Sequence, residues 1–292
     1  MFRRWLIFPA LIFLVATLCA QEHPEWRVPF APHRIAGNLY YVGGKDLAAF
    51  LITTPEGHIL INSNLQSSVP QIKESVEKLG FHFGDIKILL ISHAHLDHCA
   101  GSALIKELSG AKYMVMDADV PEIEDGGRTN FQYGSHPESL YKPAKVDRVL
   151  HDGDEVRLGG MVLTAHLTAG HTKGCTTWTF QVKDGSGKDG KNSDGKIYNV
   201  VIVGSPNVNP GYKLVRNAGY PQIAADYERT FKTLKALPCD IFLGAHGGYY
   251  GMEEKYARIG QADNPFVDPA GYKTYIADRE EAFRRELKKQ SR

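Results

Sequence analysis

The chain has 292 residues, enough to bury a substantial core as one large domain or two small ones. Its composition, 43% hydrophobic and 23% charged, is that of an ordinary globular protein and excludes a disordered or fibrous one. Lys and Arg number 34 against 33 Asp and Glu, and no basic stripe with interleaved aromatic residues occurs, so nucleic acid is not expected as a partner.

Residues 1–20 are typical of a secretory signal peptide. Two arginines stand near the start, an apolar run interrupted by one proline and one threonine follows, and the stretch after Ala20 is polar. The apolar run is too short to span a bilayer comfortably, so we predict cleavage near Ala20. Lipidation of Cys19 and an uncleaved anchor are the alternatives. Cleavage predicts a periplasmic or secreted mature protein, residues 21–292, with no stable membrane association.

The predicted elements begin with short strands and a helix. Gly43-Gly44 and a Pro-Glu-Gly turn separate three apolar runs, which favours an antiparallel meander. A helix with one apolar face then begins near Pro70 and ends at Gly80. In this half of the chain we expect strands at 38–42, 47–53, 58–62, 86–91 and 112–116, and a second helix at 103–108.

The segment 120–145 breaks this pattern. Several glycines and prolines interrupt it, and Phe131, Tyr133 and Tyr141 add aromatic side chains. A loop of this length in a compact domain is usually a lid or a binding loop. The alternative is a surface excursion packed by its own side chains.

Strand patterns resume in the second half and are again followed by helices. We expect strands at 155–158, 161–167, 176–182, 197–203 and 240–243, and helices at 223–237 and from Pro269 onward. Strands in two batches, each followed by helices, predict two sheets stacked face to face with helices outside and a site along one edge. No internal repeat and no linker between independent domains is evident.

The stretch SHAHLDHCAG, residues 92–101, is the densest chemical signal in the chain. It follows a predicted buried strand, and imidazole nitrogens and carboxylates are ligands that zinc accepts. The H-x-H-x-D-H spacing allows His93 and His95 to serve one ion and Asp97 and His98 another. The alternatives are a polar loop with chance histidines or a single structural zinc, but structural sites usually need thiolates and only Cys99 is near.

Two further histidines follow predicted strands in glycine-containing loops. His171 lies in Thr-Ala-Gly-His-Thr and His246 in Gly-Ala-His-Gly-Gly, where glycine lets the backbone approach an ion closely. Each ion would then have three protein ligands and an open position, as catalytic zinc requires. The predicted sets are His93, His95 and His171 for one Zn²⁺, and Asp97, His98 and His246 for the other.

This arrangement resembles the signature of the metallo-β-lactamase superfamily, which also includes glyoxalase II-like thioesterases, lactonases and nucleases. The resemblance implies a four-layer αββα sandwich, an α/β fold, over residues 21–292 as a single domain. Thioesterase-like branches end the strand matching 197–203 in Gly-Asp, whose carboxylate bridges both metals, whereas this chain has Gly204-Ser205. The chain is most similar to subclass B3, which has serine there. The segments that carry this similarity are 167–172, 174–178, 210–212 and 236–240.

The resemblance implies a zinc-dependent β-lactamase that confers antibiotic resistance by hydrolysing the amide bond of penicillins, cephalosporins or carbapenems. A metal-bound hydroxide would attack the lactam carbonyl, and Asp97 would orient it as the catalytic carboxylate. Ser205 and Asn207 are candidates for binding the substrate carboxylate, although Asn207 after Pro206 is equally typical of a turn. Phe131 and Tyr133 are candidates for lining the pocket.

Two other functions stay open: a promiscuous dizinc hydrolase of lactones or thioesters, and a non-catalytic zinc-binding or zinc-scavenging protein. The complete ligand set with open positions argues against the second. The chain also departs from the family pattern, because Asn62-Ser63-Asn64 stands where the superfamily often has aspartate. Three cysteines, Cys99, Cys175 and Cys239, follow the leader, so at most one disulfide can form among them. Cys239 lacks the partner cysteine that some subclass relatives have.

Overall fold

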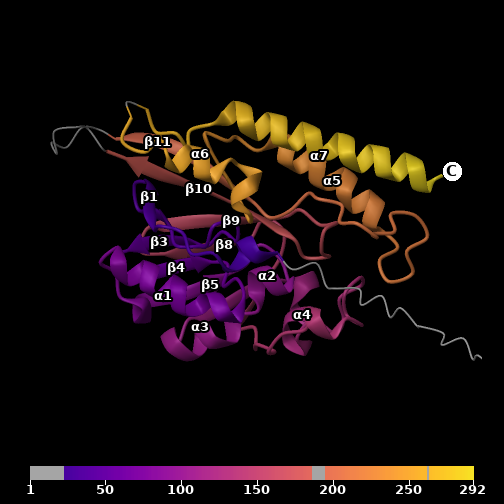
Figure 1. Ribbon diagram of the computed structural model, residues 1–292, viewed down its shortest axis with the longest axis horizontal. Helices are drawn as coiled ribbons and strands as arrows, with labels where there is room; N and C mark the ends of the chain where they lie inside the picture. The colour runs from indigo at the N-terminus through magenta and orange to yellow at the C-terminus, as the bar shows by residue number, and fades with distance from the viewer. Residues whose placement is uncertain (1–22, 186–194, 262) are drawn as a thin grey trace, which may run out of the picture.

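The structure is a computed structural model that describes residues 23–185, 195–261 and 263–292. The predicted signal peptide lies outside the described residues. Within them, strands form two sheets packed face to face, with helices on both outer faces (Figure 1). The first sheet has the order β1 (His33–Ala36), β2 (Leu39–Tyr41), β3 (Phe50–Thr54), β4 (Gly57–Ile61), β5 (Ile86–Leu90), β6 (Lys112–Met116) and β7 (Arg148–Leu150).

The second sheet contains the later strands of the described chain. Its order is β12 (Ile241–Gly244), β11 (Lys196–Val203), β10 (Thr176–Asp184), β9 (Met161–Leu167) and β8 (Glu155–Leu158). The helices are α1 (Val69–Lys78), α2 (Leu96–Cys99), α3 (Ser102–Ser109), α4 (Val120–Asp125), α5 (Ile223–Ala236), α6 (Met252–Tyr256) and α7 (Pro269–Gln290). No helix in the described segments is both long and apolar enough to span a membrane.

Alternating side chains explain why the first sheet is covered on both faces. In β4, Ile59 and Ile61 join the core between the two sheets, while Leu60 joins a second cluster with Ile72 and Val76 of α1. Successive side chains of a strand point to opposite faces, so an uninterrupted apolar strand needs a cover on each side. Helices α1 and α3 supply one cover and the second sheet supplies the other (Figure 1).

The second sheet is covered on its outer face by the long C-terminal helices. Tyr227 of α5 stacks on Phe283 of α7, and the tilted ring of Phe231 lies 5.7 Å from that of Phe283. All three belong to the same core cluster as the strands. Asp268 accepts a hydrogen bond from the Gly271 amide at 2.8 Å and caps the start of α7. The layers are therefore helix, sheet, sheet, helix, which confirms the predicted αββα sandwich (Figure 1).

Most expected elements are present, with small shifts at their ends. The antiparallel meander is confirmed for β2, β3 and β4, and the strands from β4 to β7 continue the sheet in parallel. Two strands, β1 and β7, had no predicted counterpart, because runs of four and three residues are too short to show a period. The long segment 120–145 is not entirely irregular, since α4 occupies its start.

The three cysteines in the described segments, Cys99, Cys175 and Cys239, are all free. Burial raises the pKa of the Cys175 and Cys239 thiols to about 12 and that of Cys99 well above its usual range. Thiols react as thiolates, so these cysteines are held in their unreactive form. The fold depends on its core and not on a covalent bridge between these residues.

Candidate metal centre

The six candidate ligands lie at one edge of the sandwich, where strands of both sheets end. The segment after β5, which includes α2, carries four of them, and the loops after β9 and β12 carry one each. Two hydrogen bonds join the sheets beside this edge: the Thr176 amide donates to the Ser92 carbonyl at 2.7 Å, and Trp178 Nε1 donates to the Ile91 carbonyl at 3.0 Å. The ligand loops are therefore held together by contacts between the sheets.

Three histidines form the first candidate position. His93, His95 and His171 each offer a ring nitrogen, and these nitrogens lie within 4.8 Å of one another. Both ring nitrogens of His93 are buried and have no hydrogen-bond partner in the described parts of the chain. His171 Nδ1 lies 2.8 Å from the Asn207 carbonyl, which only accepts, so Nδ1 carries the proton and Nε2 keeps its lone pair for a cation.

Asp97, His98 and His246 form the second position. Asp97 Oδ2 lies 3.1 Å from His98 Nε2 and 3.4 Å from His246 Nε2, and the two Nε2 atoms lie 3.1 Å apart. Ligands bound to one tetrahedral zinc at about 2.0–2.1 Å are separated by roughly 3.3 Å, so this triangle matches one face of such a site. His93 lies beside both positions, because Asp97 and His98 also group with it within 4.8 Å.

Burial sets the charge state of the three-histidine position. Desolvation, with repulsion from neighbouring imidazoles, holds the pKa of His93 and of His171 well below the usual range. Burial lowers the pKa of His95 to about 4. All three rings are therefore neutral at pH 7, which is the form that binds a metal ion.

The second position carries the negative charge. Burial raises the pKa of Asp97, but His98 and His246 outweigh that effect and hold it well below its usual range. Burial lowers the pKa of His246, but hydrogen bonds to Asp46 and Asp97 outweigh it and raise the value to about 9. An ionised carboxylate among imidazoles suits a divalent cation, which would displace the extra proton from His246.

Asp46 is a part of the site that the sequence patterns did not single out. Its Oδ2 accepts a hydrogen bond from His246 Nδ1 at 2.8 Å, which leaves Nε2 facing Asp97 and His98. The Gly247 amide also donates to the Asp46 carbonyl at 2.6 Å. The only local signal for Asp46 was that an acidic residue stands shortly after Gly43-Gly44. Its contact with His246 could not be predicted, because the two residues are separated by 200 positions in the sequence.

We expect Asp46→Asn to weaken metal binding at the second position by about 10–100-fold. The asparagine side chain lacks the negative charge with which the Asp46 carboxylate polarises the His246 ring and holds its Nδ1 proton. The measurement is zinc affinity by competition with a chromogenic chelator. Glu253→Gln is the matched control, because Glu253 pairs with the adjacent Lys45 on the surface. Equal affinities for Asp46→Asn and wild type would contradict the assignment.

The predicted substrate residues Ser205 and Asn207 follow β11 and share a contact with Tyr249. The Ser205 hydroxyl lies 3.2 Å from the Tyr249 hydroxyl, to which Asn207 Nδ2 donates at 2.8 Å. Asn207 Oδ1 is buried without a partner in the described chain, so this amide presents an acceptor to its surroundings. Binding a carboxylate through Asn207 therefore requires its amide group to turn over.

The predicted pocket residues Phe131 and Tyr133 lie at different depths. The Tyr133 ring is 5.3 Å from that of His95, so Tyr133 borders the three-histidine position directly. Phe131 packs on Tyr212, whose hydroxyl lies 3.4 Å from His95 Nε2, so Phe131 is one ring further from the centre.

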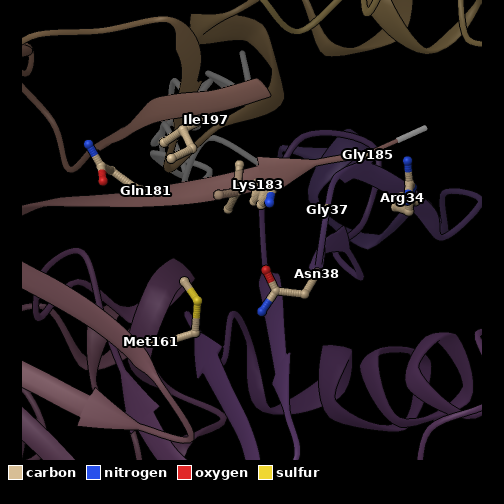
Figure 2. Close-up of a pocket in the computed structure, with 9 residues that line it drawn as sticks. Arg34, Gly37, Asn38, Met161, Gln181, Lys183, Gly185 and Ile197 are labelled. Atoms are coloured by element: carbon tan, nitrogen blue, oxygen red, sulfur yellow. The ribbon is translucent and has the colours of Figure 1, made fainter. Parts of the chain in front are cut away.

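A cavity of about 620 Å³ lies at the opposite end of the sandwich, and Figure 2 shows residues that line it. Lys183 and Ile197, which pair across β10 and β11, contribute to it, together with Asn38 from the turn between β1 and β2. The candidate ligands instead follow the other ends of their strands. The cavity is therefore separate from the candidate metal centre.

Comparisons with known proteins agree with this geometry. Residues 42–184 match the family model of the metallo-β-lactamase superfamily. The structure resembles that of the native FEZ-1 metallo-β-lactamase from Legionella gormanii, with 56% identity, a TM-score of 0.86, and coverage of 90% of this chain and 98% of that one. It also resembles BJP-1, a subclass B3 metallo-β-lactamase of Bradyrhizobium japonicum, with 37% identity, a TM-score of 0.82, and coverage of 91% and 97%.

A curated relative, a probable metallo-hydrolase from Burkholderia pseudomallei, is 30% identical over 112 residues, which are 38% of this chain and 36% of that protein. The likeness to the solved structures is far more extensive, because it covers nearly the whole of each of them. The chain belongs to the metallo-β-lactamase superfamily and, within it, groups with subclass B3.

Proposed function

We propose that the protein hydrolyses the amide bond of β-lactams and uses two Zn²⁺ held at the edge of the sandwich. The observation that carries this proposal is the convergence of His93, His95 and His171 beside a triangle formed by Asp97, His98 and His246. The extensive identity to proteins named metallo-β-lactamases supports the substrate class.

Zinc bound there would supply Lewis acidity toward the lactam carbonyl and lower the pKa of water. Asp97 stays ionised, so its carboxylate can accept a hydrogen bond from the attacking water and orient it. Tyr133 borders the three-histidine position, so its ring would contact a substrate bound there. We assign the substrate carboxylate to Ser205 and to Asn207 with its amide group turned over, and Phe131 supports the pocket wall through Tyr212.

The residue after Gly204 favours β-lactams over thioesters. Ser205 is only 1% exposed, and its hydroxyl contacts Tyr249. An uncharged side chain at this position cannot bridge two cations as a carboxylate does, so the charge at the centre comes from Asp97. We further propose that cleavage after residue 20 delivers the enzyme to the periplasm or medium, where it confers antibiotic resistance.

The test is hydrolysis of a carbapenem and a cephalosporin by the mature protein, with zinc counted in the same samples. We expect two zinc ions per chain, loss of turnover after chelation, and recovery when zinc is restored. A mock-treated sample, taken through the same dialysis without chelator, is the control for inactivation by handling.

Two results would overturn the proposal. Two bound zinc ions without β-lactam turnover, but with turnover of lactones or thioesters, would assign the site to the promiscuous hydrolase. Bound zinc without turnover of any of these substrates would indicate a zinc-binding protein.

A further inference from the structure

Asp119 is a buried carboxylate outside the six candidate ligands. It ends the turn that follows β6 and directly precedes α4, and only 1% of its surface is exposed. Burial raises the pKa of Asp119 to about 6 even though three groups donate hydrogen bonds to it. Burying a carboxylate is costly, so its three donors are what make this position tolerable.

The three donors come from two different ligand loops. The Ala94 amide and the Thr172 hydroxyl each donate to Asp119 Oδ2 at 2.9 Å, and the Gly174 amide donates to Oδ1 at 2.7 Å. Ala94 stands between His93 and His95, and Thr172 follows His171 directly. One carboxylate therefore connects the two loops that supply the three-histidine position.

Tyr141 bonds the next peptide group of the same loop, through the Ala94 carbonyl. Its hydroxyl donates to the Ala94 carbonyl at 2.8 Å. Ala94 is fully buried, and both its amide and its carbonyl are bonded to residues that follow β6. The segment 120–145 therefore braces the first metal loop as well as lining the pocket.

The close approach of the His171 loop to Asp119 requires glycine at position 174. A Cβ at this position would lie 2.6 Å from the Asp119 amide nitrogen and 2.7 Å from its Cγ. No side chain can occupy that space without moving the Asp119 backbone. The glycine after His171-Thr172-Lys173 thus lets the loop approach Asp119 closely enough to bond its carboxylate.

We propose that Asp119 is a positioning residue for metal binding: through Ala94, Thr172 and Gly174 it sets the spacing between the His93–His95 loop and the His171 loop. The inference rests on the proposed function, because it takes the three histidines as ligands. A metal site needs its ligands held at fixed separations, and a buried anchor shared by both loops supplies that constraint.

The test isolates the three-histidine position. In a His98→Ala/His246→Ala background, zinc affinity is measured by chelator competition, and the bound site is examined by Co²⁺ absorption. We expect Asp119→Asn to weaken zinc binding about tenfold and to change the Co²⁺ spectrum, because its NH₂ group faces donors and cannot accept. Asp117→Asn is the matched control, since Asp117 is exposed two positions earlier and contacts His151.

Thr172 provides a second, milder variant. Thr172→Val removes one donor to Asp119, and we expect it to weaken zinc binding, while Thr172→Ser restores it. If Asp119→Asn fails to fold, this pair still tests the same connection. Thermal unfolding of the metal-free proteins is measured alongside, because a purely structural role lowers the melting temperature without changing affinity.

The outcomes separate this inference from the proposed function. Unchanged zinc affinity and Co²⁺ spectrum in folded Asp119→Asn, or in Thr172→Val, would overturn the role of Asp119. A background protein with its three histidines intact that binds no zinc would instead count against the proposed metal site itself.

Discussion

The Asp97→Asn variant is expected to lose β-lactam turnover by about 10²–10⁴-fold, the range typical for removal of a positioned catalytic carboxylate. Asp97 Oδ2 lies 3.1 Å from His98 Nε2 and 3.4 Å from His246 Nε2, so the substitution keeps the shape of the triangle and removes its charge. The variant also loses a ligand of the second position, so we expect its zinc content to fall from two ions toward one.

Steady-state hydrolysis and zinc content of the same preparation test this expectation. Asp85→Asn is the control, because Asp85 is an exposed carboxylate that pairs with Lys87 on the surface. Wild-type turnover with two zinc ions in Asp97→Asn would show that the carboxylate neither orients the water nor holds the metal, which contradicts its assigned role.

Trp178→Ala should lower the free energy of unfolding by about 3–5 kcal/mol, as large truncations in a packed core do. Trp178 is 1% exposed and lies in β10, in the core between the two sheets. Its Nε1 donates to the Ile91 carbonyl at 3.0 Å, directly before the first metal loop. The variant therefore creates a cavity and leaves a buried carbonyl unpaired.

Urea unfolding of the metal-free protein measures the loss without a contribution from bound zinc. Trp178→Phe separates the two causes, because it retains most of the volume and should cost about 1–3 kcal/mol through the unpaired carbonyl. Ile197→Ala serves as control at a side chain that is 56% exposed, with an expected change within about 0.5 kcal/mol. A loss of unfolding free energy below about 1 kcal/mol for Trp178→Ala would mean that the two sheets do not pack tightly around the Trp178 side chain.

Sequence patterns were most informative where the signal is local. The bounds of β6, β8 and β9 agree with the expected strands at 112–116, 155–158 and 161–167. An apolar run predicts β6, and alternation of apolar and polar residues between turn residues predicts β8. The H-x-H-x-D-H loop could likewise be identified because its four candidate ligands stand within six positions. Short strands such as β1 carry too few residues for a period and were missed.

Asn62 illustrates a contribution that residue type alone did not predict. It adopts a left-handed conformation with φ of 70°. Its Oδ1 accepts from the Ser92 amide at 2.7 Å, and its Nδ2 donates to the Ala48 carbonyl at 3.1 Å. An amide can donate and accept at once, so Asn62 ties the start of the 92–101 stretch to the segment that precedes β3.

By itself, the sequence determined the two batches of strands and their layering as two sheets with helices outside, and it singled out the candidate metal ligands, because periodicity and ligand chemistry are properties of neighbouring residues. The tertiary structure alone decided that Asp46 bonds His246, that Asp119 connects the loops of Ala94 and Thr172, and that Tyr249 contacts Ser205. These partners are between 25 and 200 positions apart. Their pairing depends on where the strand ends meet in the folded chain, and no local pattern encodes that meeting.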